Sequence, residues 1–145
     1  MLSIAFCDDE PIMLEELFNV VKGYIDSKKV EFTADLFEFG EEFVEKGVRC
    51  RKYDIVFLDI EMKEMNGLEA AAWFRKLNEQ SKVIFVSSHV EYTLDAFKVA
   101  AFRYIIKNKD TMTQAVQEAL DACLDINPEI KQVKKYHFTE LDMFL

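Results

Sequence analysis

The stretch YDIVFLDIEMKEMNG, residues 53–67 of this 145-residue chain, decides the fold. Its unbroken apolar run, Ile55–Leu58, is too short for an independent helix and rich in strand-forming residues, which indicates a strand buried on both faces of a parallel sheet. Asp59 ends that run, so we expect its carboxylate at the carboxyl end of a central strand, the edge where open α/β sheets bind ligands. Asn66-Gly67 then marks a turn before the next helical stretch. Taken alone, Asp59 fits a strand-terminating turn residue equally well.

Before this stretch, the sequence predicts two strands and two helices. Residues 2–7, LSIAFC, read as the first strand, and Pro11 suits the first turn of the helix that follows. Residues 30–37 alternate as a second strand, and residues 40–47 form a short helix with Phe43 and Val44 inward. The first helix is indicated by apolar residues at helical spacing: Leu14, Leu17, Phe18, Val21 and Ile25.

After this stretch, three helices alternate with two more strands, at residues 82–87 (KVIFVS) and 103–107 (RYIIK). A helix over residues 68–78 is expected to turn four residues toward the core: Leu68, Ala71, Ala72 and Leu77. A weaker helix over residues 91–101 presents three residues on one side: Leu94, Phe97 and Ala101. The clearest amphipathic stripe defines the last helix: Met112, Ala115, Val116, Ala119, Leu120 and Cys123.

Strand and helix therefore alternate five times, which predicts an α/β fold with a parallel sheet, helices on both faces and right-handed crossovers. Residues 1–128 make one domain, closed by Asn127-Pro128. Residues 129–145 fall outside the pattern, with a basic beginning and a strand-like end, YHFTELDMFL. We interpret them as a linker and the start of a further domain, truncated within its first strand.

Composition narrows the functional classes. The chain carries 18 basic and 27 acidic residues, a formal charge of −9, so by itself it is poorly suited to bind nucleic acid. Its three cysteines are an odd number without metal-ligand spacing. Because no signal peptide or membrane span is recognisable, we expect reduced thiols in a cytoplasmic protein with no membrane partner.

Four of the five predicted strands end in residues capable of chemistry. Asp8 and Asp9 follow the first, Asp59 the third, Ser87 the fourth and Lys107 the fifth, and a parallel sheet brings all five to one edge. Two carboxylates about 4 Å apart repel by ~1 kcal/mol in water and ~4 kcal/mol at an intermediate dielectric, so such a cluster must protonate, spread apart or bind a cation. Mg²⁺ fits a site with few carboxylates and a phosphate. A carboxylate nucleophile, metal, lysine and hydroxyl are the parts needed to accept a phosphoryl group.

This pattern resembles the receiver domain of two-component response regulators. The resemblance rests on an Asp pair after strand one, an Asp after strand three, a Ser after strand four and Tyr-x-x-Lys on strand five, and it covers residues 1 to about 125. The segments DIEMKEMNG and SSHVEYTLDAFKVAAFRYIIK look most like receivers that precede LytTR-type DNA-binding domains. The resemblance implies a flavodoxin-like doubly wound sheet of five parallel strands in the order 2-1-3-4-5.

The resemblance also implies roles at the phosphoacceptor. Asp59 would be phosphorylated by a sensor histidine kinase. Asp9 and Asp59 would ligate Mg²⁺ directly, Asp8 through water, and Glu61 through its backbone carbonyl. Lys107 would bridge to the phosphoryl oxygens.

Further roles concern switching and water access. Ser87 would move toward the phosphoryl group on activation, and Tyr104 matches the aromatic residue that rotates inward with it. Glu61 and His89 sit where receivers control the access of water. The rearranged face would allow two receivers to pair, and DNA would be bound only through an output domain.

Three positions depart from the family pattern without removing a chemical group. Lys63 stands where proline is usual, and Ser88 where alanine or glycine is usual. Asn108 follows Lys107 where related receivers have a proline after a cis bond. A cis bond before a non-proline residue costs ~2.5–4 kcal/mol, so we expect the Lys107–Asn108 bond to be trans.

Other functions compete with a regulatory phosphoacceptor that is not a turnover enzyme. Asp59-x-Glu61 loosely resembles the Asp-x-Asp of phosphatases with an aspartyl-phosphate intermediate, although those place the nucleophile after the first strand. A flavin-binding module of the same topology is disfavoured because the acidic loop Asp8–Pro11 would repel the FMN phosphate. A receiver-like docking module that works without phosphorylation remains a fourth reading.

Overall fold

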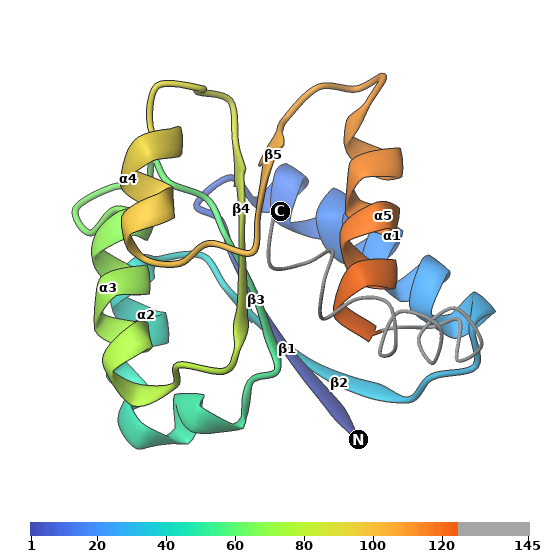
Figure 1. Cartoon of the computed structure of the whole chain (residues 1–145), viewed down its shortest axis with the longest axis horizontal. Helices are drawn as coiled ribbons and strands as arrows, with labels where there is room; N and C mark the ends of the chain where they lie inside the picture. Colours follow the sequence, from blue (N-terminus) through green and yellow to red (C-terminus); the bar gives the residue numbers. More distant parts are fainter. Residues whose placement is uncertain (125–145) are drawn as a thin grey trace, which may run out of the picture.

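A five-stranded parallel sheet forms the centre of the computed structural model, which describes residues 1–124 (Figure 1). The strands run in the spatial order β2-β1-β3-β4-β5, and every neighbouring pair is parallel. Their bounds are β1 (Leu2–Cys7), β2 (Phe32–Phe37), β3 (Ile55–Leu58), β4 (Lys82–Ser87) and β5 (Arg103–Ile106). The predicted fold class and strand order are confirmed. The predicted linker and output-domain start, residues 129–145, lie outside the described residues.

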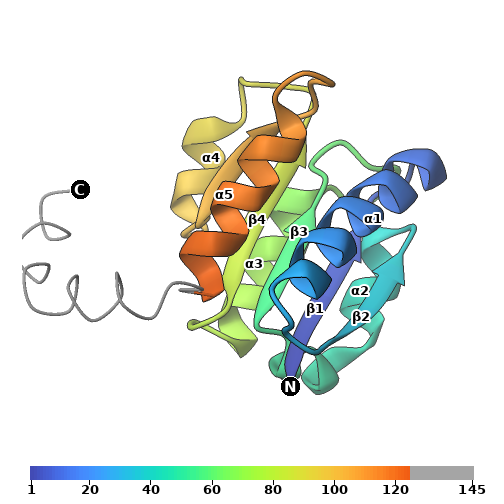
Figure 2. The same cartoon turned by 90° about the vertical axis from the view of Figure 1, so that its right-hand side faces the viewer.

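Helices cover both faces of the sheet. One face carries α1 (Pro11–Ser27) and α5 (Met112–Leu124), and the other carries α2 (Gly40–Glu45), α3 (Gly67–Leu77) and α4 (Thr93–Lys98) (Figures 1 and 2). A 3₁₀ turn, η1 (Gly47–Lys52), leads from α2 into β3. Within residues 1–124, every helix is too short or too polar to cross a bilayer.

The strand β3 explains why the sheet has two cores. Ile55 and Phe57 pack in the cluster under α1 and α5, while Val56 and Leu58 pack in the cluster under α2, α3 and α4. All four side chains are at most 1% exposed. Burying both faces of one strand requires a continuous apolar run, which is the pattern that the sequence shows.

The core-facing side of α4 differs from the prediction. Leu94 and Phe97 are 79% and 82% exposed, whereas Ala96 is buried. Tyr92, Ala96 and Val99 form the side that packs on the core. Both sets of residues have helical spacing. The set centred on Ala96 faces the sheet, because the small alanine side chain allows this six-residue helix to lie close to the sheet.

Smaller corrections concern α3 and two element ends. In α3, Ala70, Ala71 and Phe74 are buried, and the predicted core residue Ala72 is exposed. The second strand starts at Phe32 instead of residue 30, because α1 is closed by Val30 donating its N–H to the Ile25 carbonyl at 3.3 Å. The helix predicted over 40–47 ends at residue 45, before Gly47 adopts a φ of 58° and the 3₁₀ turn begins.

Arg75 of α3 forms hydrogen bonds with the segment that follows α4. Its guanidinium donates to the carbonyls of Val99 and Ala100, both at 2.8 Å, and to that of Ser81 at 2.7 Å. Ser81 lies in the loop before β4, and Val99 and Ala100 lie in the loop between α4 and β5, so this cation joins α3 to two loops of the chain.

Replacing Arg75 with alanine should lower the free energy of unfolding by about 2–3 kcal/mol, because charged hydrogen bonds to three carbonyls are lost. Urea unfolding followed by circular dichroism measures the change. Lys76→Ala, at an exposed position of the same helix, is the control and should change stability by less than ~0.5 kcal/mol. Equal losses in both variants would contradict this role of Arg75.

Candidate functional site

The carboxyl ends of four strands place the predicted functional residues at one edge of the sheet. Asp8 follows β1, Asp59 follows β3, Ser87 ends β4 and Lys107 follows β5. Asp8 is 2% exposed, Asp59 4% and Ser87 0%, so these polar groups are removed from solvent. Burial of polar side chains at a sheet edge requires partners, and the site supplies them.

Lys107 is the common partner of the carboxylates. Its Nζ lies 2.9 Å from Asp8 Oδ2, 3.2 Å from Asp59 Oδ2 and 3.3 Å from Glu10 Oε1. The lysine side chain is 7% exposed, and its backbone N–H donates to the Ser87 carbonyl at 2.9 Å. No cis peptide bond occurs within residues 1–124, so the predicted trans bond before Asn108 is confirmed, with Lys107 still directed into the site.

Burial and mutual repulsion dominate the electrostatics of the site. Burial, with the Asp8 charge, raises the pKa of Asp59 to about 7 in spite of Lys107. Burial likewise raises the pKa of Asp8. Burial alone would lower the pKa of Lys107, but Asp8 and Asp59 reverse this and raise it, so the lysine remains a cation. Among the described residues Lys107 therefore faces three carboxylates, and Asp59 is more basic than an ordinary carboxylate.

The raised pKa of Asp59 should make the metal-free protein less stable at pH 8 than at pH 5. An acid whose folded pKa is about 7 and whose unfolded pKa is ~3.9 binds more protons when folded, so the free energy of unfolding falls as pH rises between these values. Asp59→Asn removes this loss. We expect the variant to exceed the parent by about 2 kcal/mol at pH 8, with a difference that shrinks toward pH 5.

Urea titrations in a chelator at both pH values measure this difference. The control Asp110→Asn, at an exposed carboxylate, should leave the pH profile of the parent unchanged. A variant that is less stable than the parent at pH 8 would contradict the assignment.

The metal-ligand candidates are only partly brought together. Carboxylate oxygens of Asp8, Glu10 and Asp59 lie within 4.8 Å of one another. The Asp9 carboxylate instead accepts the backbone N–H of Lys63 at 3.1 Å and is not a member of this group. Glu10 was missed from the sequence, although its place directly after the acidic pair is a signal that could have indicated it.

The residues predicted to govern water access contact each other. His89 Nε2 lies 2.8 Å from Glu61 Oε2, and Tyr92 donates its hydroxyl to Glu61 Oε1 at 2.8 Å. Glu91 approaches the other ring nitrogen of His89 at 3.5 Å. These contacts connect the loop after Asp59 with the loop after β4. Tyr92 takes part in them, although the sequence did not indicate a role for it.

Ser87 and Tyr104, the predicted switch pair, meet at the same loop. The Ser87 hydroxyl accepts the backbone N–H of His89 at 3.1 Å, and the Tyr104 hydroxyl donates to the His89 carbonyl. Tyr104 is half-buried, and its ring lies 6.2 Å from that of Phe85 on the neighbouring strand. A displacement of the loop at His89 would consequently affect both hydroxyls.

Comparisons with known proteins agree with this geometry. The model of the response regulator receiver domain family matches residues 4–118. The transcriptional regulatory protein LytR of Staphylococcus aureus is 31% identical over 103 residues, covering 69% of this chain and 39% of LytR. The sensory transduction protein LytT of Bacillus anthracis is 35% identical over 110 residues, covering 76% and 43%. The chain thus spans about two fifths of the length of these relatives.

Solved structures are similar over most of the chain. The response regulator TrrA from Thermotoga maritima, solved in complex with Mg²⁺-BeF, has a TM-score of 0.65 and 32% identity and covers 82% of this chain and 99% of its own. The receiver domain of AraT from Geobacillus stearothermophilus has a TM-score of 0.70 and 23% identity, and covers 92% and 98%. Strand order, buried site and family match agree, and the chain belongs to the response regulator receiver domain family.

Proposed function

We propose that Asp59 accepts a phosphoryl group from a sensor histidine kinase. The observation that carries the proposal is a nearly buried carboxylate held 3.2 Å from the ammonium group of Lys107. An Asp59 carboxylate oxygen forms a bond to phosphorus while the bond from phosphorus to the donor's histidine nitrogen breaks, and that nitrogen keeps the electron pair. The fixed charge of Lys107 stabilises negative charge on the transferring oxygens, because it is already in place and shielded from water.

A divalent ion fits the donor set of this site. Three carboxylate side chains offer hard oxygen ligands within 4.8 Å of one another, as Mg²⁺ requires. We propose that Asp59 holds Mg²⁺ directly and that Asp9 joins it after its carboxylate releases the Lys63 N–H that it accepts in this structure. Asp8 acts through water and Glu61 through its carbonyl, and Glu10 joins this set because its carboxylate lies near those of Asp8 and Asp59. When bound, Mg²⁺ would neutralise charge on phosphoryl oxygens.

The remaining residues support switching in this proposal. Ser87 moves to donate its hydroxyl hydrogen to the phosphoryl group, and this movement releases the His89 N–H that its oxygen now accepts. Tyr104 follows because its hydroxyl is bonded to the same residue, and Glu61 with His89 limits the access of water to the acyl phosphate. The rearranged surface of α4, β5 and α5 would let two receivers pair.

The biological setting follows from the relatives. We propose a cytoplasmic regulatory phosphoacceptor that is not a turnover enzyme, with residues 1–128 as the receiver and residues 129–145 as linker and output-domain start. Its output would be transcriptional, through a LytTR-type DNA-binding domain, as the name of the Staphylococcus aureus relative supports. The receiver's own charge of −9 makes a separate basic module necessary for DNA binding.

Incubation with Mg²⁺ and acetyl phosphate, followed by intact mass spectrometry, tests the phosphoacceptor. The parent chain should gain one phosphoryl group, and the gain should disappear with Asp59→Asn or when a chelator removes the metal. Asp95→Asn, at an exposed carboxylate of α4, should be labelled like the parent. Persistent labelling of the Asp59→Asn variant would refute the assignment.

A further inference from the structure

Within residues 1–124, the outer edge of the sheet at β2 carries no further strand. In this part of the chain β2 is the terminal strand and pairs with β1 alone. Glu31 and Phe37 turn their carbonyls toward β1, where they accept the N–H groups of Leu2 at 3.3 Å and Asp8 at 3.1 Å. Successive residues of a strand direct their backbone groups to opposite sides. The outward set is therefore the even-numbered one: Phe32, Ala34 and Leu36.

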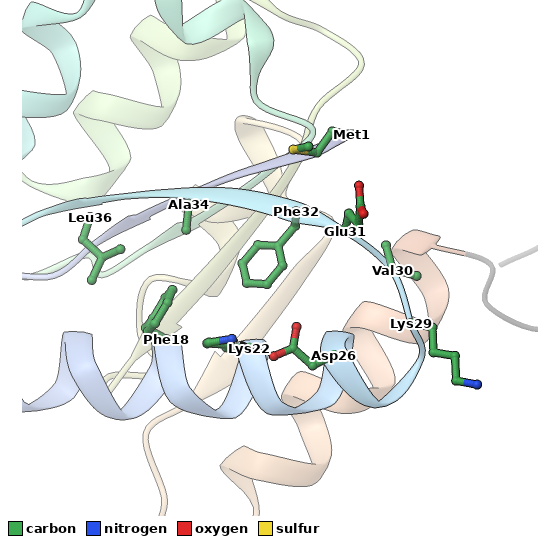
Figure 3. Close-up of a pocket in the computed structure, with 10 residues that line it drawn as sticks. All are labelled: Met1, Phe18, Lys22, Asp26, Lys29, Val30, Glu31, Phe32, Ala34 and Leu36. Atoms are coloured by element: carbon green, nitrogen blue, oxygen red, sulfur yellow. Dashed lines mark hydrogen bonds and ion pairs between the residues drawn. The ribbon is translucent and has the colours of Figure 1, made fainter.

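The same three residues border an apolar groove. Their side chains face α1 across a groove of 830 Å³, into which Phe18 projects from the helix (Figure 3). Leu36 is 44% exposed, which is high for a leucine in a strand. The charged residues of the groove balance in number, because Lys22 and Asp26 form an ion pair at 2.7 Å, and Lys29 and Glu31 contribute one charge of each sign. This groove therefore favours apolar side chains.

A basic hollow borders the opposite face of the same edge. It measures 250 Å³ and contains three cationic side chains, Lys46, Arg49 and Lys52, against one carboxylate, Asp35. That carboxylate is already satisfied by the Tyr53 hydroxyl at 2.6 Å and by Lys52 at 3.2 Å. Glu42 and Glu45 line the adjoining hollow with Lys46 and Arg49, and the Glu42 carboxylate accepts the N–H groups of Glu38 and Phe39. Within the hollow itself three cations face one carboxylate, which favours an acidic ligand.

We propose that the edge of β2 docks an extended segment of a partner protein whose side chains alternate between apolar and acidic. The segment adds a strand by pairing with the outward groups of Phe32, Ala34 and Leu36. Since side chains of a strand alternate between faces, its apolar residues enter the groove and its acidic residues reach Lys46 and Arg49. A second copy of β2 is less complementary, because its other face offers Thr33 and the already paired Asp35.

A synthetic peptide of alternating valine and glutamate, long enough to span β2, tests this surface on the full chain. Amide exchange by NMR should show fast exchange at Phe32, Ala34 and Leu36 in the free protein and protection when the peptide is added. The matched peptide with lysine in place of glutamate should not protect them, because the basic hollow repels it.

Three variants separate the parts of the surface. Ala34→Pro removes one outward N–H, at an edge position where proline is tolerated, and should weaken peptide binding about tenfold. Leu36→Lys leaves the backbone intact and should weaken peptide binding, because it places a charge in the apolar groove. Arg49→Glu should weaken peptide binding, because it repels the glutamates of the peptide from the basic hollow. Phe97→Ala, an exposed aromatic on α4, is the control and should bind like the parent.

Four results would overturn the proposal. Equal affinity for the lysine peptide would remove the charge argument, and full affinity in both Leu36→Lys and Arg49→Glu would place the peptide elsewhere. Protection of the outward amides in the peptide-free protein at every concentration would mean that this chain covers its own edge. Protection that develops with increasing protein concentration would identify a second copy as the occupant.

Discussion

Replacing Lys107 with methionine should reduce the free energy of unfolding by about 3–5 kcal/mol at pH 8, because it leaves buried carboxylates without their counter-charge. Asp8 and Asp59 are both nearly buried, and each lies within 3.2 Å of the ammonium group. Methionine fills a similar volume, so lost packing contributes little.

The pH dependence identifies the cause. Without Lys107, the pKa values of Asp8 and Asp59 rise above their already raised values, so both carboxyls are neutral in acid. The destabilisation should therefore be greatest at pH 8 and shrink as the pH falls toward 5. Urea unfolding across this range measures it, with the exposed Lys109→Met as control.

A double variant provides the decisive comparison. Lys107→Met combined with Asp59→Asn should recover part of the stability lost in the single variant, because one uncompensated charge is removed with the cation. A loss that is the same at every pH, or that the second substitution does not relieve, would show that packing rather than charge explains the effect.

Replacing Gly67 with alanine should destabilise the fold by about 3 kcal/mol, through a steric conflict with the backbone of Asp59 and Ile60. A Cβ at this position would lie 1.9 Å from the Asp59 carbonyl oxygen and 3.0 Å from Ile60 Cα. These are backbone atoms, which cannot rotate away as a side chain can. The Gly67 N–H also donates to the Ile60 carbonyl at 2.9 Å, so the first residue of α3 cannot move without loss of that bond.

The helix propensity of alanine alone would stabilise α3, so a glycine in an uncrowded part of another helix provides a matched control. Alanine is favoured over glycine within a helix by about 1 kcal/mol. Gly23→Ala in α1 has no atom within 4 Å of the new Cβ, so that variant should be stabilised by about this amount. Thermal and urea unfolding of both variants gives the comparison, and a stabilised Gly67→Ala would contradict the steric account. The displaced Asp59 should also be phosphorylated more slowly by acetyl phosphate.

The parts of the fold that could be predicted are those where one physical requirement dominates. The run Ile55–Leu58 must be apolar because both faces of β3 are buried, and its pattern allows one interpretation. The strands at residues 2–7 and 82–87 match their predicted bounds for the same reason. Parallel connections then bring the strand ends together, which is why Asp59 and Lys107 could be paired from the sequence.

Prediction was weaker where several arrangements satisfy the same pattern. In α4, two stripes share helical spacing, and the choice between them depends on how closely Ala96 lets the helix approach the sheet. At the site, Asp8, Asp9 and Glu10 are neighbours in sequence, so the local turn decides which carboxylates point inward. The Asp8 carboxylate accepts the Glu10 N–H at 2.9 Å, and this turn brings Glu10 back toward Lys107. The adjacency of these three residues marks all of them as candidates, but it does not determine which of their carboxylates turn toward Lys107.

The anchoring of the segment around α4 by Arg75 has an evolutionary consequence. Each of its partners at Val99, Ala100 and Ser81 is a main-chain carbonyl, which every amino acid provides. Substitutions on the outer surface of α4, such as at Leu94 or Phe97, can therefore accumulate without releasing the helix from α3. Paralogous receivers built in this way could diverge in the partners that they recognise while they inherit one unchanged scaffold.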